Sequence, residues 1–288
     1  MSRTRGIIWG SGGCYGSGVG RNDIRDGRGN VSVLSGNKPW PAPLEANVTW
    51  ETLLEGSPIP IQLKGVAPWR LPGVSGGTGL LLRTNRGSIR CLFHGAEDST
   101  KGIIWAGGSN FNGAGGLYPI LSDELVGDGI SSLRMSYRER PTRGTPEEFM
   151  ECVLDVLVGI MFFQERGYQR IALVGHSLGG AVVIAAAPIF DSVMTVVSLA
   201  SQTYGAQHVS LVSPRPILLV HGEGDTRLGP ERSKLIYDTA REPKELVLYP
   251  GAGHSLVECR DQLHPLLRTW LVDKFNVGDS QGQATPSH

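Results

Sequence analysis

The sequence predicts an α/β fold in which a mostly parallel sheet is covered by helices on both faces. From Thr78 onward, short continuous apolar runs alternate with longer segments whose apolar residues recur at helical spacing. Continuous apolar strands of this kind are typical of parallel sheets that are buried on both sides. A chain of 288 residues with 40% hydrophobic residues can form one large domain of this class.

Residues 1–75 differ in composition and precede this pattern. They contain 13 glycines and 7 prolines, yet also four of the six tryptophans: Trp9, Trp40, Trp50 and Trp69. Disordered segments are usually poor in aromatic residues. We therefore predict an extended amino-terminal arm over 1–75 that packs on the main body, with the part around Trp40 to Trp69 narrowing the pocket. Residues 76–276 form the main domain, and 277–288 are expected to be a flexible polar tail.

The expected strands are eight in number. The first two flank Asn85-Arg86-Gly87, a plausible hairpin turn, and the rest are apolar runs between helical segments. The predicted strands cover residues 80–84, 88–94, 103–108, 132–137, 170–175, 193–199, 217–221 and 245–249.

Four helices complete the expected pattern. Thr145-Pro146-Glu147-Glu148 has the residues of an N-cap and capping box, and apolar residues follow at helical spacing until Gly167. Helices are also expected over 178–188, 230–240 and 256–275, the last bent or restarted at Pro265.

The strongest chemical signal is Gly175-His176-Ser177-Leu178-Gly179-Gly180. It contains G-x-S-x-G directly after a predicted strand and before a helix rich in small residues, which is the context of a nucleophile elbow. The turn is too tight for side chains at its flanking positions, hence the glycines. It would expose the Ser177 hydroxyl, with backbone N–H groups of the following helix beside it.

A serine hydroxyl needs a base and an acid that orients it, in the chain order serine, acid, histidine. Asp225 and His254 each lie in a glycine-rich loop after a predicted strand, in that order. The carboxyl ends of parallel strands meet at one edge of a sheet, so these side chains are expected to converge on Ser177.

Other residues compete for these roles. Glu223 lies on the same loop as Asp225 and could replace it as the acid. His221 is expected to support the acid loop by hydrogen bonding, and His176 to pack beside the elbow. His94 and His208 have no motif around them.

An oxyanion hole requires two N–H donors. Leu178, the residue after the nucleophile, is expected to supply one, and either Gly107 or Gly108, after the strand at 103, the other. The following loop, with Ser109, Asn110 and Phe111, is expected to line the substrate pocket. Ser201 and Tyr204, which follow the predicted strand 193–199, are expected to line it as well.

These motifs resemble those of the α/β-hydrolase superfamily, most closely compact members similar to dienelactone hydrolases and small carboxylesterases. The resemblance covers roughly residues 78–275 and implies the α/β-hydrolase fold, with Ser177, Asp225 and His254 as a catalytic triad. Only residues 200–216 separate two strands where many relatives insert a cap, so no cap domain is expected. Ser177 stands where dienelactone hydrolases have cysteine, which argues against that specific reaction.

Composition limits the classes of partner and cofactor. Lys and Arg number 27, as do Asp and Glu, so nothing indicates a nucleic acid or an anionic membrane as partner. The cysteines are far apart in the sequence and predict reduced, packed thiols without a metal or redox pair. No signal peptide or membrane-spanning run is recognised, and cytoplasmic localisation is expected. The arginine cluster at 134, 138, 140 and 143 is interpreted as a solvated surface strip, with anion binding as the alternative.

The predicted function is hydrolysis of a small carboxylic ester through a Ser-His-Asp triad and an acyl-enzyme, without metal or organic cofactor. A thioesterase, peptidase or acyltransferase would use the same triad, because fold and triad do not set the substrate. A non-catalytic binding protein of the same fold is a further alternative. The natural substrate, the acyl length and the oligomeric state are not predicted.

Overall fold

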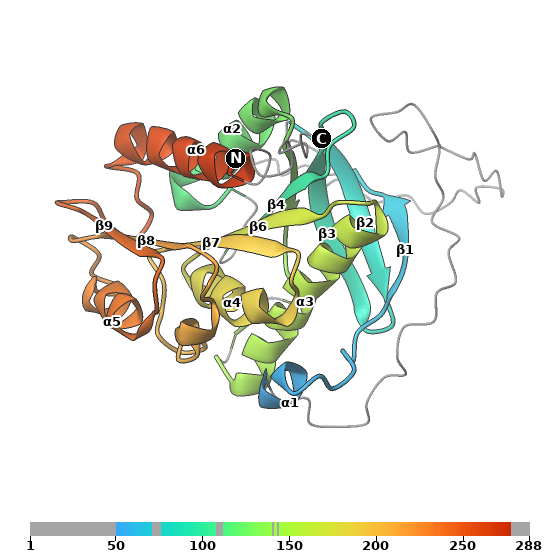
Figure 1. Cartoon of the computed structure of the whole chain (residues 1–288), viewed down its shortest axis with the longest axis horizontal. Coiled ribbons are helices and arrows are strands. Elements are labelled where there is room, and N and C mark those ends of the chain that lie inside the picture. Colours follow the sequence, from blue (N-terminus) through green and yellow to red (C-terminus); the bar gives the residue numbers. More distant parts are fainter. Residues whose placement is uncertain (1–49, 71–75, 108–111, 140, 143, 278–288) are drawn as a thin grey trace, which may run out of the picture.

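A computed structural model describes residues 50–70, 76–107, 112–139, 141–142 and 144–277. The described strands form one twisted sheet in the order β1-β2-β3-β5-β4-β6-β7-β8-β9 (Figure 1). From β5 to β9 the neighbouring strands in this order are parallel, whereas β1, β2 and β3 pair antiparallel. The expected α/β class is confirmed.

The strands and helices have the following bounds. The strands are β1 Leu63–Pro68, β2 Thr78–Thr84, β3 Gly87–His94, β4 Lys101–Ala106, β5 Ser131–Met135, β6 Arg170–His176, β7 Val193–Leu199, β8 Ile217–Gly222 and β9 Lys244–Tyr249. The helices are α1 Trp50–Leu54, α2 Leu117–Glu124, α3 Pro146–Glu165, α4 Leu178–Ala186, α5 Glu231–Thr239 and α6 Arg260–Asn276, and short 3-10 turns include η1 Ala114–Gly116 and η3 Ala187–Ile189.

Two apolar layers hold the sheet between the helices (Figure 1). Helices α3, α4 and α5 cover one face, where Val153, Leu173 and Val182 belong to one buried cluster. Helices α2 and α6 cover the other, where Trp105 and Leu263 belong to a second cluster. Burial of both faces explains why the central strands read as continuous apolar runs.

The sheet has nine strands, so the prediction of eight was wrong by one. The additional strand is β1, which lies within the segment predicted to be an extended arm and pairs antiparallel with β2. Its sequence, Leu-Lys-Gly-Val-Ala-Pro, gives little strand signal because an edge strand is only half buried and tolerates glycine and proline.

The described part of the arm packs at one end of the sheet. Leu53 and Ile61 are buried, and α1 contacts η3, which follows the end of α4 farthest from Ser177. Four strands separate β1 from β6, so residues 50–70 do not narrow a pocket at Ser177. Residues 1–49 and 71–75, with Trp9 and Trp40, lie outside the described residues, as does the tail from 278.

Several predicted boundaries need correction. The strand expected to reach residue 108 ends at Ala106, and α6 begins at Arg260, four residues later than predicted, with Pro265 inside one helix. Helix α2 was not predicted at all. Thr145 is the N-cap of α3 as expected, since its Oγ1 accepts a hydrogen bond from the Glu148 N–H at 3.3 Å.

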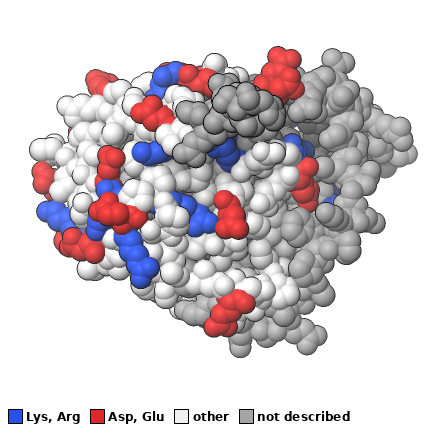
Figure 2. All heavy atoms as spheres, in the orientation of Figure 1, with Lys and Arg blue, Asp and Glu red and all other residues white. Residues whose placement is uncertain are grey.

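Among the described residues, no helix is long and apolar enough to cross a membrane. Acidic and basic side chains are interspersed over the described part of the face in Figure 2, in keeping with the zero net charge. Cys91, Cys152 and Cys259 are buried free thiols, and Cys14 lies outside the described residues.

Candidate active site

The turn between β6 and α4 holds Ser177 in a strained backbone conformation. Its φ of 60° and ψ of −121° are unfavourable for a residue with a Cβ atom, and such strain gathers at functional sites. Two hydrogen bonds hold the turn: the Ser177 N–H donates to the Leu199 carbonyl at 2.8 Å, and the Gly180 N–H donates to the Ser177 carbonyl at 3.0 Å.

The glycines around Ser177 are required by close backbone packing. A Cβ atom at Gly175 would lie 2.1 Å from the Gly179 carbonyl oxygen, and one at Gly179 would lie 2.2 Å from the Ala106 oxygen. Both distances are far below van der Waals contact. The second of them shows how closely α4 approaches the end of β4, where the loop predicted to supply an oxyanion donor begins.

His254 lies on the loop after β9 and faces the serine. Its Nε2 is 3.0 Å from the Ser177 Oγ, within hydrogen-bond distance, although 77 positions separate the two residues. The His254 side chain is 12% exposed, so its ring reaches the surface while its two nitrogens face protein atoms.

Asp225 follows β8 and lies on the other side of the His254 ring. Its Oδ2 is 2.7 Å from Nδ1 of His254, and its Oδ1 accepts backbone N–H groups of Arg227 at 2.8 Å and Leu228 at 3.0 Å. Burial alone would raise the pKa of Asp225, but the hydrogen bonds from Leu228, His254 and Arg227 hold it below its ordinary value. The group is therefore a buried carboxylate.

These contacts determine the tautomer of His254. A carboxylate only accepts hydrogen bonds, so Nδ1 carries the proton and donates it to Asp225. The lone pair of Nε2 then faces the Ser177 hydroxyl, which donates to it. The hydrogen-bonded chain Ser177–His254–Asp225 is the arrangement required for removing a proton from the serine.

His221, near the end of β8, supports the carboxylate of Asp225 by hydrogen bonding. Its Nε2 lies 2.7 Å from the Leu228 carbonyl and 3.2 Å from the Asp225 Oδ2, so it donates to both acceptors. Nδ1 then accepts from the Ser233 hydroxyl at 2.6 Å. His221 is fully buried, as expected for a residue that supports the acid loop.

Glu223 is exposed, and Asp225 is the carboxylate in contact with His254. His94 is buried against Asp123 and Arg134, and His208 is only partly buried.

The predicted oxyanion and pocket residues are only partly described. Gly107 is buried directly after β4, and Leu178 is the first residue of α4, so its N–H makes no intrahelical bond. Gly108, Ser109, Asn110 and Phe111 lie outside the described residues. Ser201 is buried beside the first turn of α4, where a Cβ at Gly180 would lie 2.8 Å from it.

Tyr204 stands at the surface on the loop after β7. It is 43% exposed and meets the ring of Phe149 edge-on, with ring centroids 5.4 Å apart. Phe149 comes from the first turn of α3, and no sequence signal associated it with Tyr204.

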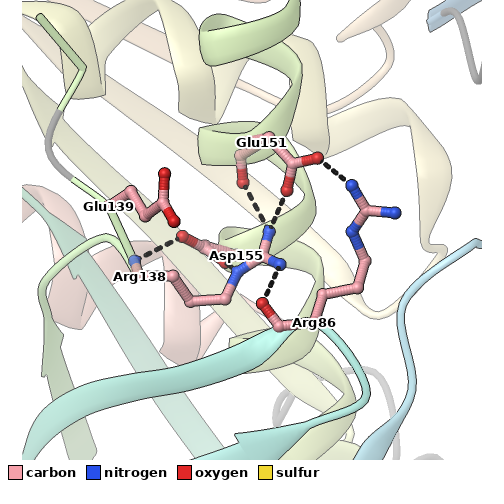
Figure 3. A pocket seen from close by; sticks show the side chains of 5 residues that line it. All are labelled: Arg86, Arg138, Glu139, Glu151 and Asp155. Carbon is pink, nitrogen blue, oxygen red and sulfur yellow. Dashed lines mark hydrogen bonds and ion pairs between the residues drawn. The ribbon is translucent and has the colours of Figure 1, made fainter.

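A charged cavity of about 420 Å³ lies between the β2–β3 hairpin and α3 (Figure 3). Arg138 pairs there with Asp155 and Glu151 and donates to the Arg86 carbonyl at 3.1 Å, and Glu139 completes the lining. Burial raises the pKa of Asp155 to about 6, against the opposing effect of Arg138.

The expected solvated arginine strip is therefore wrong for its two described members. Arg138 is nearly buried in the cavity, and Arg134 is fully buried, with its Nε donating to the His94 Nε2 at 3.1 Å. Arg140 and Arg143 lie outside the described residues. Within the described ranges, no group of three or more His, Cys, Asp or Glu residues is arranged to hold a metal ion.

Comparisons with known proteins agree with the fold. Residues 134–268 match the model of the Dienelactone hydrolase family. The chain is 33% identical over 109 residues to the uncharacterised protein YfhR of Escherichia coli, a match that covers 30% of this chain and 38% of YfhR. The chain thus aligns with well under half the length of this curated relative.

Solved structures are similar at the level of fold. Est1E from Butyrivibrio proteoclasticus superimposes with a TM-score of 0.60 at 14% identity, covering 70% of this chain and 100% of that one. A dienelactone hydrolase from Anabaena variabilis gives 0.56 at 16% identity, covering 66% and 93%. XC6422 from Xanthomonas campestris, a serine hydrolase without a lid, gives 0.54 at 20% identity, covering 70% and 98%.

Proposed function

We propose that this chain, which has the α/β-hydrolase fold and resembles the dienelactone hydrolase family, is a serine hydrolase that cleaves carboxylic esters. The family match supports hydrolase activity in general. One observation carries the finer proposal: Ser177, His254 and Asp225 form a continuous hydrogen-bonded chain at the carboxyl edge of the sheet.

The geometry supports acyl transfer to water. As the Ser177 oxygen attacks a carbonyl carbon, His254 Nε2 takes the serine proton, and Asp225 stabilises the imidazolium that forms. The imidazolium then gives its proton to the leaving alcohol, which departs and leaves an acyl-serine. Water then attacks the carbonyl carbon of the acyl-serine while His254 takes a proton from it. The imidazolium returns this proton to the serine oxygen as the carboxylic acid is released, which restores the Ser177 hydroxyl.

Backbone N–H groups would hold the oxyanion that forms during both steps. We propose the Leu178 N–H as one donor, because it lies next to the nucleophile at the start of α4. Gly107 or Gly108 would supply the second donor. No step requires a metal ion or an organic cofactor.

The same residues can serve a thioesterase, a peptidase or an acyltransferase. Esters are preferred to amides because an alkoxide is a better leaving group than the nitrogen anion of an amide, and because β6 lies inside the described sheet, between β4 and β7, with no free strand edge for a peptide beside Ser177. Small acyl compounds are the proposed substrates.

The test is a substrate panel measured on the wild type and on Ser177→Ala. The panel contains p-nitrophenyl esters of two to twelve carbons, the matching thioesters and anilides, and methyl ferulate. The last is included because ferulic acid is bound to Est1E in a structure similar to this one. We expect the fastest turnover on an ester and its loss in Ser177→Ala. Turnover confined to thioesters or anilides would replace the ester assignment, and equal turnover by both proteins would refute the serine mechanism.

A further inference from the structure

The residue before the nucleophile makes a contact that the proposed chemistry does not itself require. His176 is the last residue of β6, and its Nε2 lies 2.8 Å from the backbone carbonyl oxygen of His254. The two imidazole rings lie 5.2 Å apart, tilted by 45°. A carbonyl oxygen only accepts hydrogen bonds, so Nε2 of His176 carries a proton and donates it.

The His176 ring keeps this role over the pH range in which a histidine base operates. Burial lowers the pKa of His176 to about 4, against the opposing effect of its hydrogen bond to the His254 carbonyl. The ring is therefore neutral near neutral pH. A positive charge at this place would oppose the formation of the His254 imidazolium, whereas a neutral donor holds the loop without adding charge.

The other backbone hydrogen bonds around His254 lie within its own loop or join that loop to the loop after β8, where the Gly224 N–H donates to the Ala252 carbonyl at 2.9 Å. The Gly253 N–H donates to the exposed Glu258 carboxylate at 3.0 Å, and the Leu256 N–H donates to the Gly253 carbonyl at 3.1 Å. These bonds shape the loop but do not tie it to the strand that carries the nucleophile. The His176 contact joins the peptide of His254 to the residue next to Ser177.

We propose that His176 is a positioning residue that sets the distance between the base and the nucleophile by holding the His254 carbonyl. This inference rests on the proposed serine mechanism. Reaction between Ser177 and His254 depends on two elements 77 positions apart, and a displacement of about 1 Å from reacting geometry can cost on the order of 100-fold in rate. The hydrogen bond from His176 to the His254 carbonyl limits the displacement of the base relative to the nucleophile.

Two substitutions separate the donor from the ring. His176→Gln keeps an N–H donor at a similar reach but loses the ring, whereas His176→Phe keeps a ring of similar size but loses the donor. We expect the Phe variant to lose about 10- to 100-fold in kcat with KM changed less than about threefold, and the Gln variant to stay within about threefold of the wild type. His264→Phe is the matched control, because His264 pairs with Glu124 on the surface, outside the site.

A second measurement distinguishes positioning from general damage. In a His254→Ala background the base is absent, so His176→Phe should not reduce the residual turnover further. A loss in that background as large as in the wild type would overturn the inference, as would a Phe variant that is active and a Gln variant that is impaired. If the Phe variant does not fold, His176→Ala replaces it with the same expectations. A wild type without Ser177-dependent turnover would refute the proposed function itself, and the inference with it.

Discussion

Replacing Asp225 with Asn should stop turnover through the tautomer of His254. The Oδ1 position of Asp225 accepts two backbone N–H groups, at 2.8 and 3.0 Å, so the oxygen of an asparagine amide must occupy it. The amide NH₂ then faces His254 and His221. It donates to the His254 Nδ1, which moves the imidazole proton to Nε2, where it points at Ser177.

In that tautomer His254 cannot accept the serine proton. The expected loss in kcat is on the order of 10⁴-fold, as for the corresponding change in a serine protease triad. The new NH₂ also faces the N–H of His221, whose bond to Asp225 at 3.2 Å is lost. The His221 N–H keeps its shorter bond to the Leu228 carbonyl at 2.7 Å, so the free energy of unfolding should fall by only about 1 kcal/mol, the net contribution of one hydrogen bond.

The assay is steady-state hydrolysis of the best ester from the panel, with urea unfolding in parallel and Glu223→Gln as the matched control. Glu223 is exposed on the same loop, so its change should leave kcat within about twofold, as is usual for surface substitutions that break no contact. If Asp225→Asn retains more than a tenth of the wild-type kcat while Glu223→Gln is inactive, Glu223 is the acid and this reasoning is refuted.

Three further predictions concern stability, each measured by urea unfolding. The pKa of His176 is lowered from 6.5 to about 4 in the folded protein, so its contribution to the free energy of unfolding is complete above pH 6.5 and is lost as the pH falls towards 4. The loss is at most about 3 kcal/mol and should be absent from His176→Gln. Gly179→Ala places a Cβ 2.2 Å from a carbonyl oxygen of β4 and should cost about 2 kcal/mol or more, whereas Gly127→Ala, with open space around it, should be neutral. Arg138→Met leaves Asp155 buried without its cation and should cost about 3–5 kcal/mol, and adding Asp155→Leu should recover most of the loss. A pH-independent difference between wild type and His176→Gln, equal effects of the two glycine changes, or an unrecovered double variant would contradict the respective prediction.

The convergence of the three candidate site residues was predictable because motif and topology agree. The G-x-S-x-G motif indicates a nucleophile elbow only when a strand precedes it and a helix follows it. The apolar run before Ser177 and the small apolar residues after it predicted both elements. Once the sheet is parallel, residues that follow β6, β8 and β9 must lie at the same edge. The loops after β8 and β9 carry few other groups able to serve as acid and base, so chain order and loop position pointed to Asp225 and His254, with Glu223 left as an alternative acid.

What the sequence did not reveal depends on contacts that leave no periodic pattern. Strand β1 is an edge strand with one glycine and one proline, so its sequence lacks a continuous apolar run. The strand forms through its pairing with β2, which the sequence does not indicate. Arg134 and Arg138 read as a charged surface strip because burial of a charge depends on partners distant in sequence, here His94 and Asp155. The contact from His176 to the His254 carbonyl likewise involves a backbone atom, which no residue pattern can indicate.

The central claim is that Ser177 is the nucleophile, and covalent labelling tests it most directly. The wild type is treated with a fluorophosphonate, digested and mapped by mass spectrometry, beside Ser177→Ala and His254→Ala. A single adduct on Ser177, absent from Ser177→Ala and slowed by at least about 100-fold in His254→Ala, is the predicted result. An adduct on another serine, or labelling of Ser177→Ala at the wild-type rate, would contradict the account.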